Sequence, residues 1–300
     1  MSRPSSRSLF VLIGLAVAVI GLAAATLIRY PDKVRLHWDR LTRPPEVVDM
    51  GGYQISLRDR GQGTPTVIIE GGVDVEKGAY HDLQLRLAQY TRVISYDRAG
   101  VGESTASGAP RTLPNFTREL EALLEKLQVP PPYILVGHSL GGHIIRYHAS
   151  VFPERVAGLV FLDHPHEDWF RYIRATWPKA EADAYFKGWP TDPSKVGPKH
   201  QELLTYERNC DLVRGIQLPP DIPVLMFTGN NRWHFRQGIG QERDRQEWLR
   251  LQKSLLTGVK DARHIVDWET GHWAFFDKPD MVEREIADFI EKCRQHVARP

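Results

Sequence analysis

The stretch that most constrains this chain is a serine enclosed by glycines between two regular elements. The pattern G-x-S-x-G is met by Gly137-His138-Ser139-Leu140-Gly141. The apolar run before it, 133–136, follows three prolines and is typical of a buried parallel strand. The run after it, 141–152, has helical spacing. Passing from strand to helix at one serine requires a sharp, strained turn with small neighbours, so we expect Ser139 at the tip of that turn.

Strands and helices alternate along most of the chain, which favours an α/β domain with a mostly parallel sheet. We expect strands at 66–70, 92–96, 133–136, 156–163, 222–228 and 263–268. We expect helices at 79–90, 116–128, 141–152 and 241–256, and a final helix from about 279. In the helix at 116–128, the residues expected to face solvent are Arg118, Glu119, Glu121 and Glu125.

One internal segment, 166–220, breaks this alternation. It contains helical pieces interrupted by prolines and is dense in aromatic residues, among them Trp169, Phe170 and Trp177. These rings predict either a lipophilic binding wall or the hydrophobic core of a small helical insertion.

From about Glu46 to the C-terminus, the chain resembles the α/β-hydrolase superfamily. The resemblance is carried by the G-x-S-x-G turn, by Gly271-His272-Trp273 after the last strand, and by Asp97-Arg98-Ala99-Gly100-Val101-Gly102-Glu103-Ser104, which is similar to the family's D-x-x-G-x-G-x-S turn. It implies an opening β-hairpin at 46–50 and 53–58 and a twisted, mostly parallel sheet flanked by helices. The core is then formed by 46–165 and 221–300, and a helical cap by 166–220. The turn at 97–104 is interpreted as structural, because no Lys-Ser or Lys-Thr follows its glycines as in a phosphate-binding loop.

The resemblance assigns catalytic roles residue by residue. Ser139 matches the nucleophile and His272 the general base that activates it. The usual acid position follows the strand at 222–228, where asparagines 230 and 231 stand instead. Some members, including pancreatic-type lipases, take the acid from the end of the preceding strand, which selects Asp163 here. Four further carboxylates are the alternatives: Glu167 and Asp168 next, then Glu242 and Asp244.

The resemblance also implies two backbone amides that stabilise an oxyanion. The first is Leu140 N–H, which follows the serine at a helix N-terminus. The second is Val73 N–H in the loop Gly71-Gly72-Val73, where Gly71 replaces the family's frequent histidine. An ordinary strand-to-helix turn is the competing interpretation of that loop.

Composition excludes some classes of function. The formal net charge is +2, which gives no electrostatic argument for a nucleic-acid partner. Cys210 and Cys293 are far apart and lack metal-ligand spacing, so they are either buried thiols or a disulfide. No metal or other cofactor is expected, and the oligomeric state is not indicated.

The N-terminus carries twenty uncharged residues, Leu9–Ile28, between basic flanks. At about 1.5 Å per residue this run spans roughly 30 Å, the thickness of a bilayer's hydrocarbon core. We predict a transmembrane anchor over 1–30 and a polar tether over 31–45. A cleaved signal peptide is the alternative, because Ala23-Ala24-Ala25 resembles a cleavage site. The side of the membrane that holds the catalytic domain is left open.

These features together predict a membrane-anchored serine hydrolase. Its expected substrate is a small molecule with a hydrophobic acyl group, joined as an ester, thioester or amide. Two alternatives use the same pocket: a receptor-like binding protein with little turnover, and an acyltransferase with the same catalytic residues.

Overall fold

The computed structural model describes residues 38–39, 42–190, 196, 201–229, 235 and 240–298. The predicted membrane helix, Leu9–Ile28, lies outside these residues. Among the helices within the described ranges, none is both long and apolar enough to cross a bilayer. Contacts divide the chain into two units, 1–44 and 45–300, and the second unit holds the sheet.

The second unit is built on one sheet of eight strands in the order β1-β2-β4-β3-β5-β6-β7-β8. The strands are β1 Glu46–Asp49, β2 Gln54–Arg60, β3 Val67–Glu70, β4 Val93–Tyr96, β5 Tyr133–His138, β6 Val156–Leu162, β7 Val224–Gly229 and β8 Ala262–Asp267. β1, β2 and β4 pair antiparallel, and the remaining pairs are parallel. Because the parallel strands all run the same way, the residues that follow them gather at one edge of the sheet.

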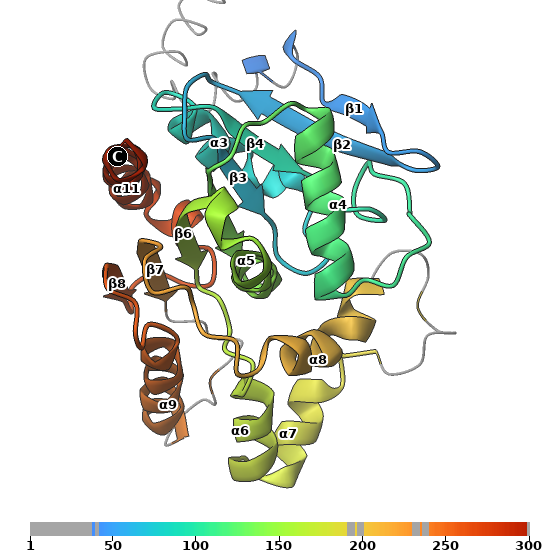
Figure 1. The fold of residues 1–300 in the computed structure, drawn as a ribbon. Coiled ribbons are helices and arrows are strands. Elements are labelled where there is room, and N and C mark those ends of the chain that lie inside the picture. The colour runs from blue at the N-terminus through green and yellow to red at the C-terminus, as the bar shows by residue number, and fades with distance from the viewer. Residues whose placement is uncertain are drawn as a thin grey trace, which may run out of the picture. The chain divides into compact units, whose positions relative to one another are not determined.

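Helices cover both faces of the sheet (Figure 1). They are η1 Lys77–Tyr80, α3 His81–Leu87, α4 Leu113–Lys126, α5 Leu140–Val151, η2 Pro153–Arg155, α6 Trp169–Thr176, α7 Lys179–Phe186, α8 Gln201–Val213, α9 Gly240–Leu255, α10 Ala274–Asp277 and α11 Pro279–Val297. One face packs Leu135 and Phe161 with α4 and α5, and the other packs Val136 and Val160 with α3 and α11. Neighbouring strand residues point to opposite faces, which is why these continuous apolar runs serve two cores.

Several predicted helix boundaries were wrong by a few residues. The stretch expected as one helix over 79–90 is a 3₁₀ turn, η1, followed by α3, which ends at Leu87. The helix expected from residue 116 begins at Leu113, because Pro114 fits the first turn, where no intrahelical N–H bond is needed. Glu119 does not face solvent: it is buried and pairs with Arg111.

Three helices, α6, α7 and α8, lie between β6 and β7 in the sequence. In Figure 1 they lie together beyond the end of β6, on the same side as the ends of the parallel strands. Their aromatic residues pack mainly against one another, as in the perpendicular contact of Phe170 with Phe186, whose ring centroids lie 5.1 Å apart. These rings therefore form a hydrophobic core, as one of the two interpretations expected, and this core also includes Leu140 and Ile144 of α5.

The turn 97–104 is held by hydrogen bonds from its own backbone and from η1. Asp97 accepts the amides of Lys77 and Glu103 at 2.6 and 3.0 Å and the Lys77 ammonium at 2.7 Å. Gly102 has φ +55°, and an ideal Cβ there would lie 2.4 Å from the Asp97 carboxylate. The structural role expected for this motif agrees with these contacts.

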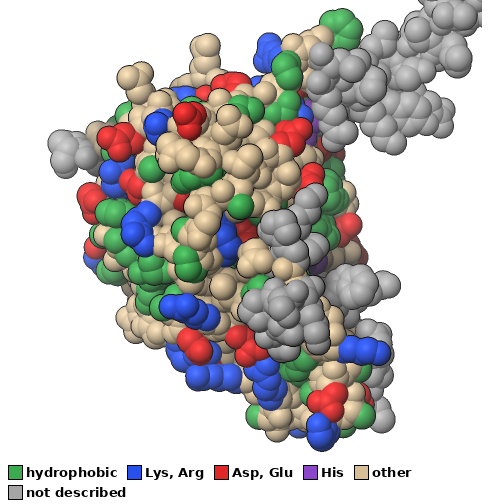
Figure 2. All heavy atoms as spheres, turned by 90° about the vertical axis from the view of Figure 1, so that its right-hand side faces the viewer, with side chains coloured by type: hydrophobic (Ala, Val, Ile, Leu, Met, Phe, Trp, Pro, Cys, Tyr) green, Lys and Arg blue, Asp and Glu red, His purple; other side chains and the backbone are tan. Residues whose placement is uncertain are grey.

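Charged side chains of both signs are intermixed on the face shown in Figure 2. Both cysteines are buried and free, which excludes the disulfide alternative.

Candidate active site

The turn between β5 and α5 places Ser139 in a strained backbone conformation. Its φ is +52° and its ψ is −118°, and the residue is 9% exposed. Steric crowding explains why both flanking residues are glycines. A Cβ on Gly137 would lie 2.6 Å from the Gly141 carbonyl oxygen, and one on Gly141 would lie 2.2 Å from the Glu70 carbonyl oxygen. The motif therefore folds as the sequence pattern predicts, with a serine at the tip of a tight turn.

A carboxylate and an imidazole meet beside this turn. The Oδ2 atom of Asp163, directly after β6, lies 2.7 Å from Nδ1 of His272. The second oxygen, Oδ1, accepts the amide of Gly229 at 3.0 Å. Since a carboxylate only accepts, Nδ1 of His272 carries the proton and donates it, which leaves Nε2 with the lone pair that a general base needs.

The other candidate carboxylates have different partners. Glu167 forms a buried bidentate pair with Arg146 at 2.6 and 3.1 Å. Asp168 pairs with Arg214 at 3.0 Å. Among the described residues, neither contacts His272, so the structure does not support Glu167 or Asp168 as its partner.

The two remaining alternatives, Asp244 and Glu242, lie on α9. Asp244 accepts hydrogen bonds from Tyr172 and Trp177 at 2.8 and 3.2 Å, and Glu242 accepts one from Gln246 at 3.0 Å. The asparagines at 230 and 231 fall outside the described residues. Asp163 is thus the described carboxylate that contacts the imidazole of His272.

The loop Gly71–Asp74, termed here the oxyanion loop, passes close to the serine. An ideal Cβ on Gly72 would lie only 3.3 Å from Cβ of Ser139, so the absence of a side chain permits the close approach. Within the described part of the chain, neither Val73 N–H nor Leu140 N–H donates to a protein acceptor. These are the two amides that the sequence analysis selected.

A hydrogen-bonded chain that the sequence analysis missed connects the oxyanion loop, η1, the end of β5 and the loop of His272. The amide of Gly72 donates to Oη of Tyr80 at 2.7 Å, and Oη lies 2.9 Å from Nδ1 of His138. Nε2 of His138 lies 3.0 Å from the carbonyl oxygen of His272. Because that carbonyl can only accept, Nε2 of His138 donates, Nδ1 accepts, and the Tyr80 hydroxyl must be the donor to it.

The protonation states of these groups agree with that direction. Burial lowers the pKa of His138 well below its ordinary value, and the nearby His272 lowers it further, so the ring is neutral. Burial raises the pKa of Tyr80, so its hydroxyl keeps its proton. The histidine inside G-x-S-x-G was the sequence signal for this chain of bonds, but Tyr80 had none.

A second neutral histidine, His164, is hydrogen-bonded to the backbone of the serine turn. Nδ1 of His164 donates to the carbonyl oxygen of Ser139 at 3.0 Å. Burial lowers the pKa of His164 to about 3. An ideal Cβ on Gly142 would lie 2.3 Å from its ring, which explains the second glycine of the Gly141-Gly142 pair.

The site has an apolar side and a separate cavity. Val73 and Trp268 pack against the aromatic core of α6–α8 that also contains Leu140. A cavity of about 430 Å³ lies beside the oxyanion loop, lined among others by Asp74, Ala99 and Glu202. No group of three or more His, Cys, Asp and Glu side chains in the described ranges is arranged to hold a metal ion.

Comparisons with known proteins agree with this architecture. A family model described as the alpha/beta hydrolase fold matches residues 67–190. Many solved structures share the fold, among them a thermophilic esterase from Thermogutta terrifontis, which is 18% identical with a TM-score of 0.56 over 83% of this chain and 98% of that one. The chain has the α/β-hydrolase fold.

Two further proteins are similar to this chain. YqjL of Bacillus subtilis (strain 168) is 28% identical over 240 residues, which cover 79% of this chain and 88% of YqjL. The enol-lactonase from Burkholderia xenovorans LB400 is 18% identical, with a TM-score of 0.56 over 82% of this chain and all of that one. At this identity the solved structures establish the fold alone.

Proposed function

We propose that this α/β hydrolase is a serine hydrolase that cleaves a carboxylic ester through an acyl-enzyme. The observation that carries the proposal is the 2.7 Å contact between Asp163 and Nδ1 of His272, next to a serine with φ +52°. In the proposed reaction, Nε2 of His272 takes the Ser139 proton as the oxygen attacks the substrate carbonyl carbon. Asp163 holds the imidazole in that tautomer and stabilises the imidazolium.

The proposed reaction has two halves that balance in protons. When the carbonyl bond to the leaving group breaks, His272 returns its proton to the departing alkoxide and the acyl group remains on Ser139. Water then repeats the attack with His272 as base, which releases the acid and restores the serine. The amides of Val73 and Leu140 are proposed to stabilise the negative oxygen in both halves.

A hydrophobic acyl group is the proposed substrate feature. Val73 and Leu140 belong to or pack against the aromatic core of α6–α8, so the proposed oxyanion donors adjoin an apolar wall. Two structural neighbours are a thermophilic esterase and an enol-lactonase, which supports an ester as the bond that is cleaved. A thioester or amide, and transfer of the acyl group to an alcohol instead of water, would use the same groups.

The receptor-like binding protein with little turnover was considered because no acid stands at the usual position. The contact of Asp163 with His272 supports hydrolysis over that alternative. The membrane anchor at Leu9–Ile28 remains part of the proposal, and sedimentation of the full chain with membranes, compared with a chain that begins at residue 31, would test it.

A fluorophosphonate probe tests the nucleophile. Wild type should be labelled covalently and Ser139→Ala should not, and p-nitrophenyl butyrate should be turned over repeatedly by wild type only. Equal labelling of the two proteins would show that Ser139 is not the nucleophile. A single burst without further turnover would favour the binding protein.

A further inference from the structure

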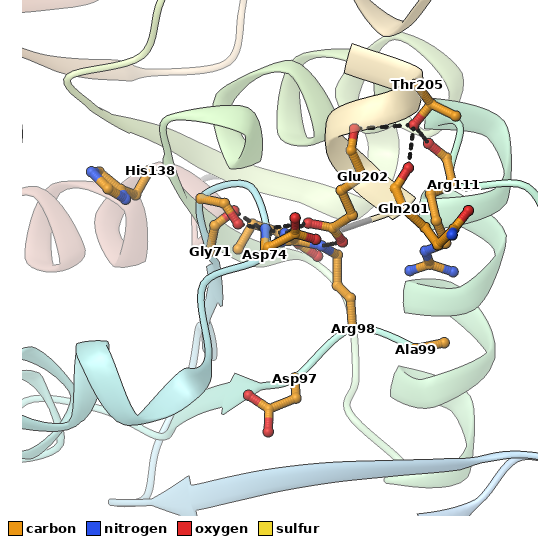
Figure 3. Close-up of polar contacts among 12 residues, drawn as sticks. Gly71, Asp74, Asp97, Arg98, Ala99, Arg111, His138, Gln201, Glu202 and Thr205 are labelled. Atoms are coloured by element: carbon orange, nitrogen blue, oxygen red, sulfur yellow. Dashed lines mark hydrogen bonds and ion pairs between the residues drawn. The ribbon is translucent and has the colours of Figure 1, made fainter. Parts of the chain in front are cut away.

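A buried ionic cluster lies beneath the oxyanion loop and has no place in the reaction as proposed. Arg98, from the turn after β4, is 3% exposed, and its two carboxylate partners, Glu70 and Glu202, are 0% and 1% exposed. Figure 3 shows Arg98 extending from that turn to Glu202, with Gly71 and Asp74 beside them. Taking such charges out of water is costly, so their arrangement calls for a specific explanation.

Every N–H of the Arg98 guanidinium has an acceptor. Nε and Nη2 each donate to Glu202 at 2.7 Å, and Nη1 donates to Glu70 at 3.2 Å. The two remaining N–H groups go to backbone: Nη1 donates to the Gly71 carbonyl at 2.9 Å and Nη2 to the Gly72 carbonyl at 2.6 Å. The planar fork thus joins two carboxylates to two consecutive peptide groups.

The Gly72 carbonyl belongs to the same peptide group as Val73 N–H. Since that group is planar and trans, fixing the oxygen fixes the direction of the N–H on the opposite side. The preceding peptide is held at both ends, by Arg98 on the Gly71 carbonyl and by Tyr80 on the Gly72 amide. A cation on the Gly72 oxygen also polarises the peptide, which makes Val73 N–H a stronger donor.

The third peptide of the loop is held by Glu202 itself. Its Oε2 accepts the amide of Asp74 at 2.7 Å, where the backbone has φ +53°. Glu202 lies on α8, in the segment between β6 and β7, 104 residues away from Arg98 in the sequence. Burial alone would raise the pKa of Glu202, but the attraction and hydrogen bonds of Arg98 hold it below its ordinary value, so it is a carboxylate at neutral pH.

We propose that Arg98 and Glu202 are positioning residues that aim the Val73 amide at the oxyanion and thereby couple the docking of α8 to catalysis. This rests on the proposed serine-hydrolase function, in which Val73 is an oxyanion donor. The coupling follows from the cluster itself: displacement of α8 removes Glu202, and the Asp74 amide and the guanidinium then lose their shared partner.

A matched pair of variants tests this role. Glu119 pairs with Arg111 at 3.0 and 3.1 Å and accepts the amide of Ala99 at 3.0 Å, so it has the same kinds of partner as Glu202 without contacting the oxyanion loop. Glu202→Gln and Glu119→Gln each remove one buried charge at nearly constant shape. Both are expected to lower the melting temperature, but only Glu202→Gln should alter the stabilisation of the oxyanion.

The measurements distinguish a changed direction of Val73 N–H from a general loss of stability. With p-nitrophenyl butyrate, Glu202→Gln is expected to lower kcat about 10- to 100-fold with KM within about threefold, since losing an oxyanion donor outright costs about 10²–10³-fold. Its affinity for butylboronic acid, which forms a tetrahedral adduct with the serine, should fall by a similar factor. Glu119→Gln should keep kcat and boronate affinity within about twofold of wild type.

Each result decides one question. Equal losses of kcat in the two variants, or wild-type kcat and boronate affinity in Glu202→Gln, would overturn the positioning role. If wild type itself neither hydrolyses the ester nor reacts with a fluorophosphonate, the proposed function fails instead. Should Glu202→Gln not fold, Glu202→Asp keeps the charge but cannot reach both Arg98 and the Asp74 amide, and the same kcat and boronate losses are expected from it.

Discussion

The ends of β6 and β7 are neighbours in the sheet, yet they contribute different groups to the site. β6 is followed by Asp163, whose φ is +43° and whose carboxylate reaches His272. β7 ends at Gly229, which contributes only its backbone N–H, donated to the same carboxylate at 3.0 Å. β7, after which the family resemblance places the acid, therefore orients a carboxylate that follows its neighbour β6.

Crowding explains why the end of β7 contributes no side chain at Gly229. An ideal Cβ there would lie 2.4 Å from the carbonyl oxygen of Gly271, in the loop that carries His272. This loop packs directly on β7, so a carboxylate on the adjacent strand can reach the imidazole without displacing it. The comparison teaches that the His272 loop packs too closely on Gly229 for a side chain there, whereas Asp163 after the adjacent strand reaches the imidazole. It can be tested in order of expected effect.

The largest effect is expected from Asp163→Asn. The amide can present its NH₂ group to Nδ1 of His272, which would leave the proton on Nε2, the wrong tautomer for a base. We expect kcat for p-nitrophenyl butyrate to fall about 10⁴-fold with little change in KM. Asp168→Asn should stay within about twofold of wild type, and the opposite ranking of the two variants would assign the acid to Asp168.

A smaller effect is expected from Gly229→Ala, which tests the crowding at the end of β7. The added methyl would push the Gly271 carbonyl and shift His272, and displacements near 1 Å cost about 10²-fold in rate. We expect a fall in kcat of that size and a lower melting temperature. Gly188→Ala is the control, since its Cβ meets nothing within 4 Å and its φ is ordinary. Unchanged kcat in Gly229→Ala would show that the loop adapts.

Tyr80→Phe extends the comparison to β3 and β5, because the Tyr80 hydroxyl joins the loop after β3 to His138, the last residue of β5. The change removes the acceptor of the Gly72 amide and the donor to His138. We expect kcat to fall about 10-fold and stability to fall by about 1–3 kcal/mol, the cost of a buried unpaired polar group. Tyr90→Phe removes an exposed hydroxyl bound to Glu283 and should change neither. An equal kcat in both variants would contradict a role for Tyr80 in the site.

The smallest effect on activity is expected from His164→Asn, at the residue after Asp163. Its amide can replace Nδ1–H as the donor to Ser139, so kcat at pH 7 should stay within a few fold. The free energy of unfolding should depend on pH differently in His164→Asn than in wild type. The folded-state pKa of His164 is about 3 against about 6.5 unfolded, so below pH 6.5 only the unfolded chain takes up this proton.

This uptake favours the unfolded chain, so the free energy of unfolding should fall as the pH drops from about 6.5 to 4. One such histidine contributes about 1.4 kcal/mol per pH unit. The curve of His164→Asn, measured by urea unfolding at several pH values, should be flatter by that slope. Parallel curves for the two proteins would show that His164 is protonated in the folded chain as readily as in the unfolded one.

Local backbone requirements could be predicted from the sequence alone. The glycine at 137 is required by a close contact inside one turn, and the G-x-S-x-G pattern predicted the position of Ser139. Gly141 and Gly142 are required by close contacts with Glu70 and His164, which lie far from them in the sequence. The apolar runs predicted the strands, because burial on both faces leaves little choice of residue. Helix ends were less accurate, since capping and a 3₁₀ turn depend on a few local bonds.

Only the tertiary structure decided which charged and polar groups meet. Arg98 and Glu202 are 104 residues apart, and neither carries a local signal that distinguishes a buried partner from a solvated charge. Glu119 shows the same limitation, since its place on a helix predicted exposure, but the folded chain buries it in a pair with Arg111. The steric requirements inside a turn involve residues a few positions apart, so a local sequence pattern reveals them. The pairing of charges depends instead on how strands and helices pack in three dimensions.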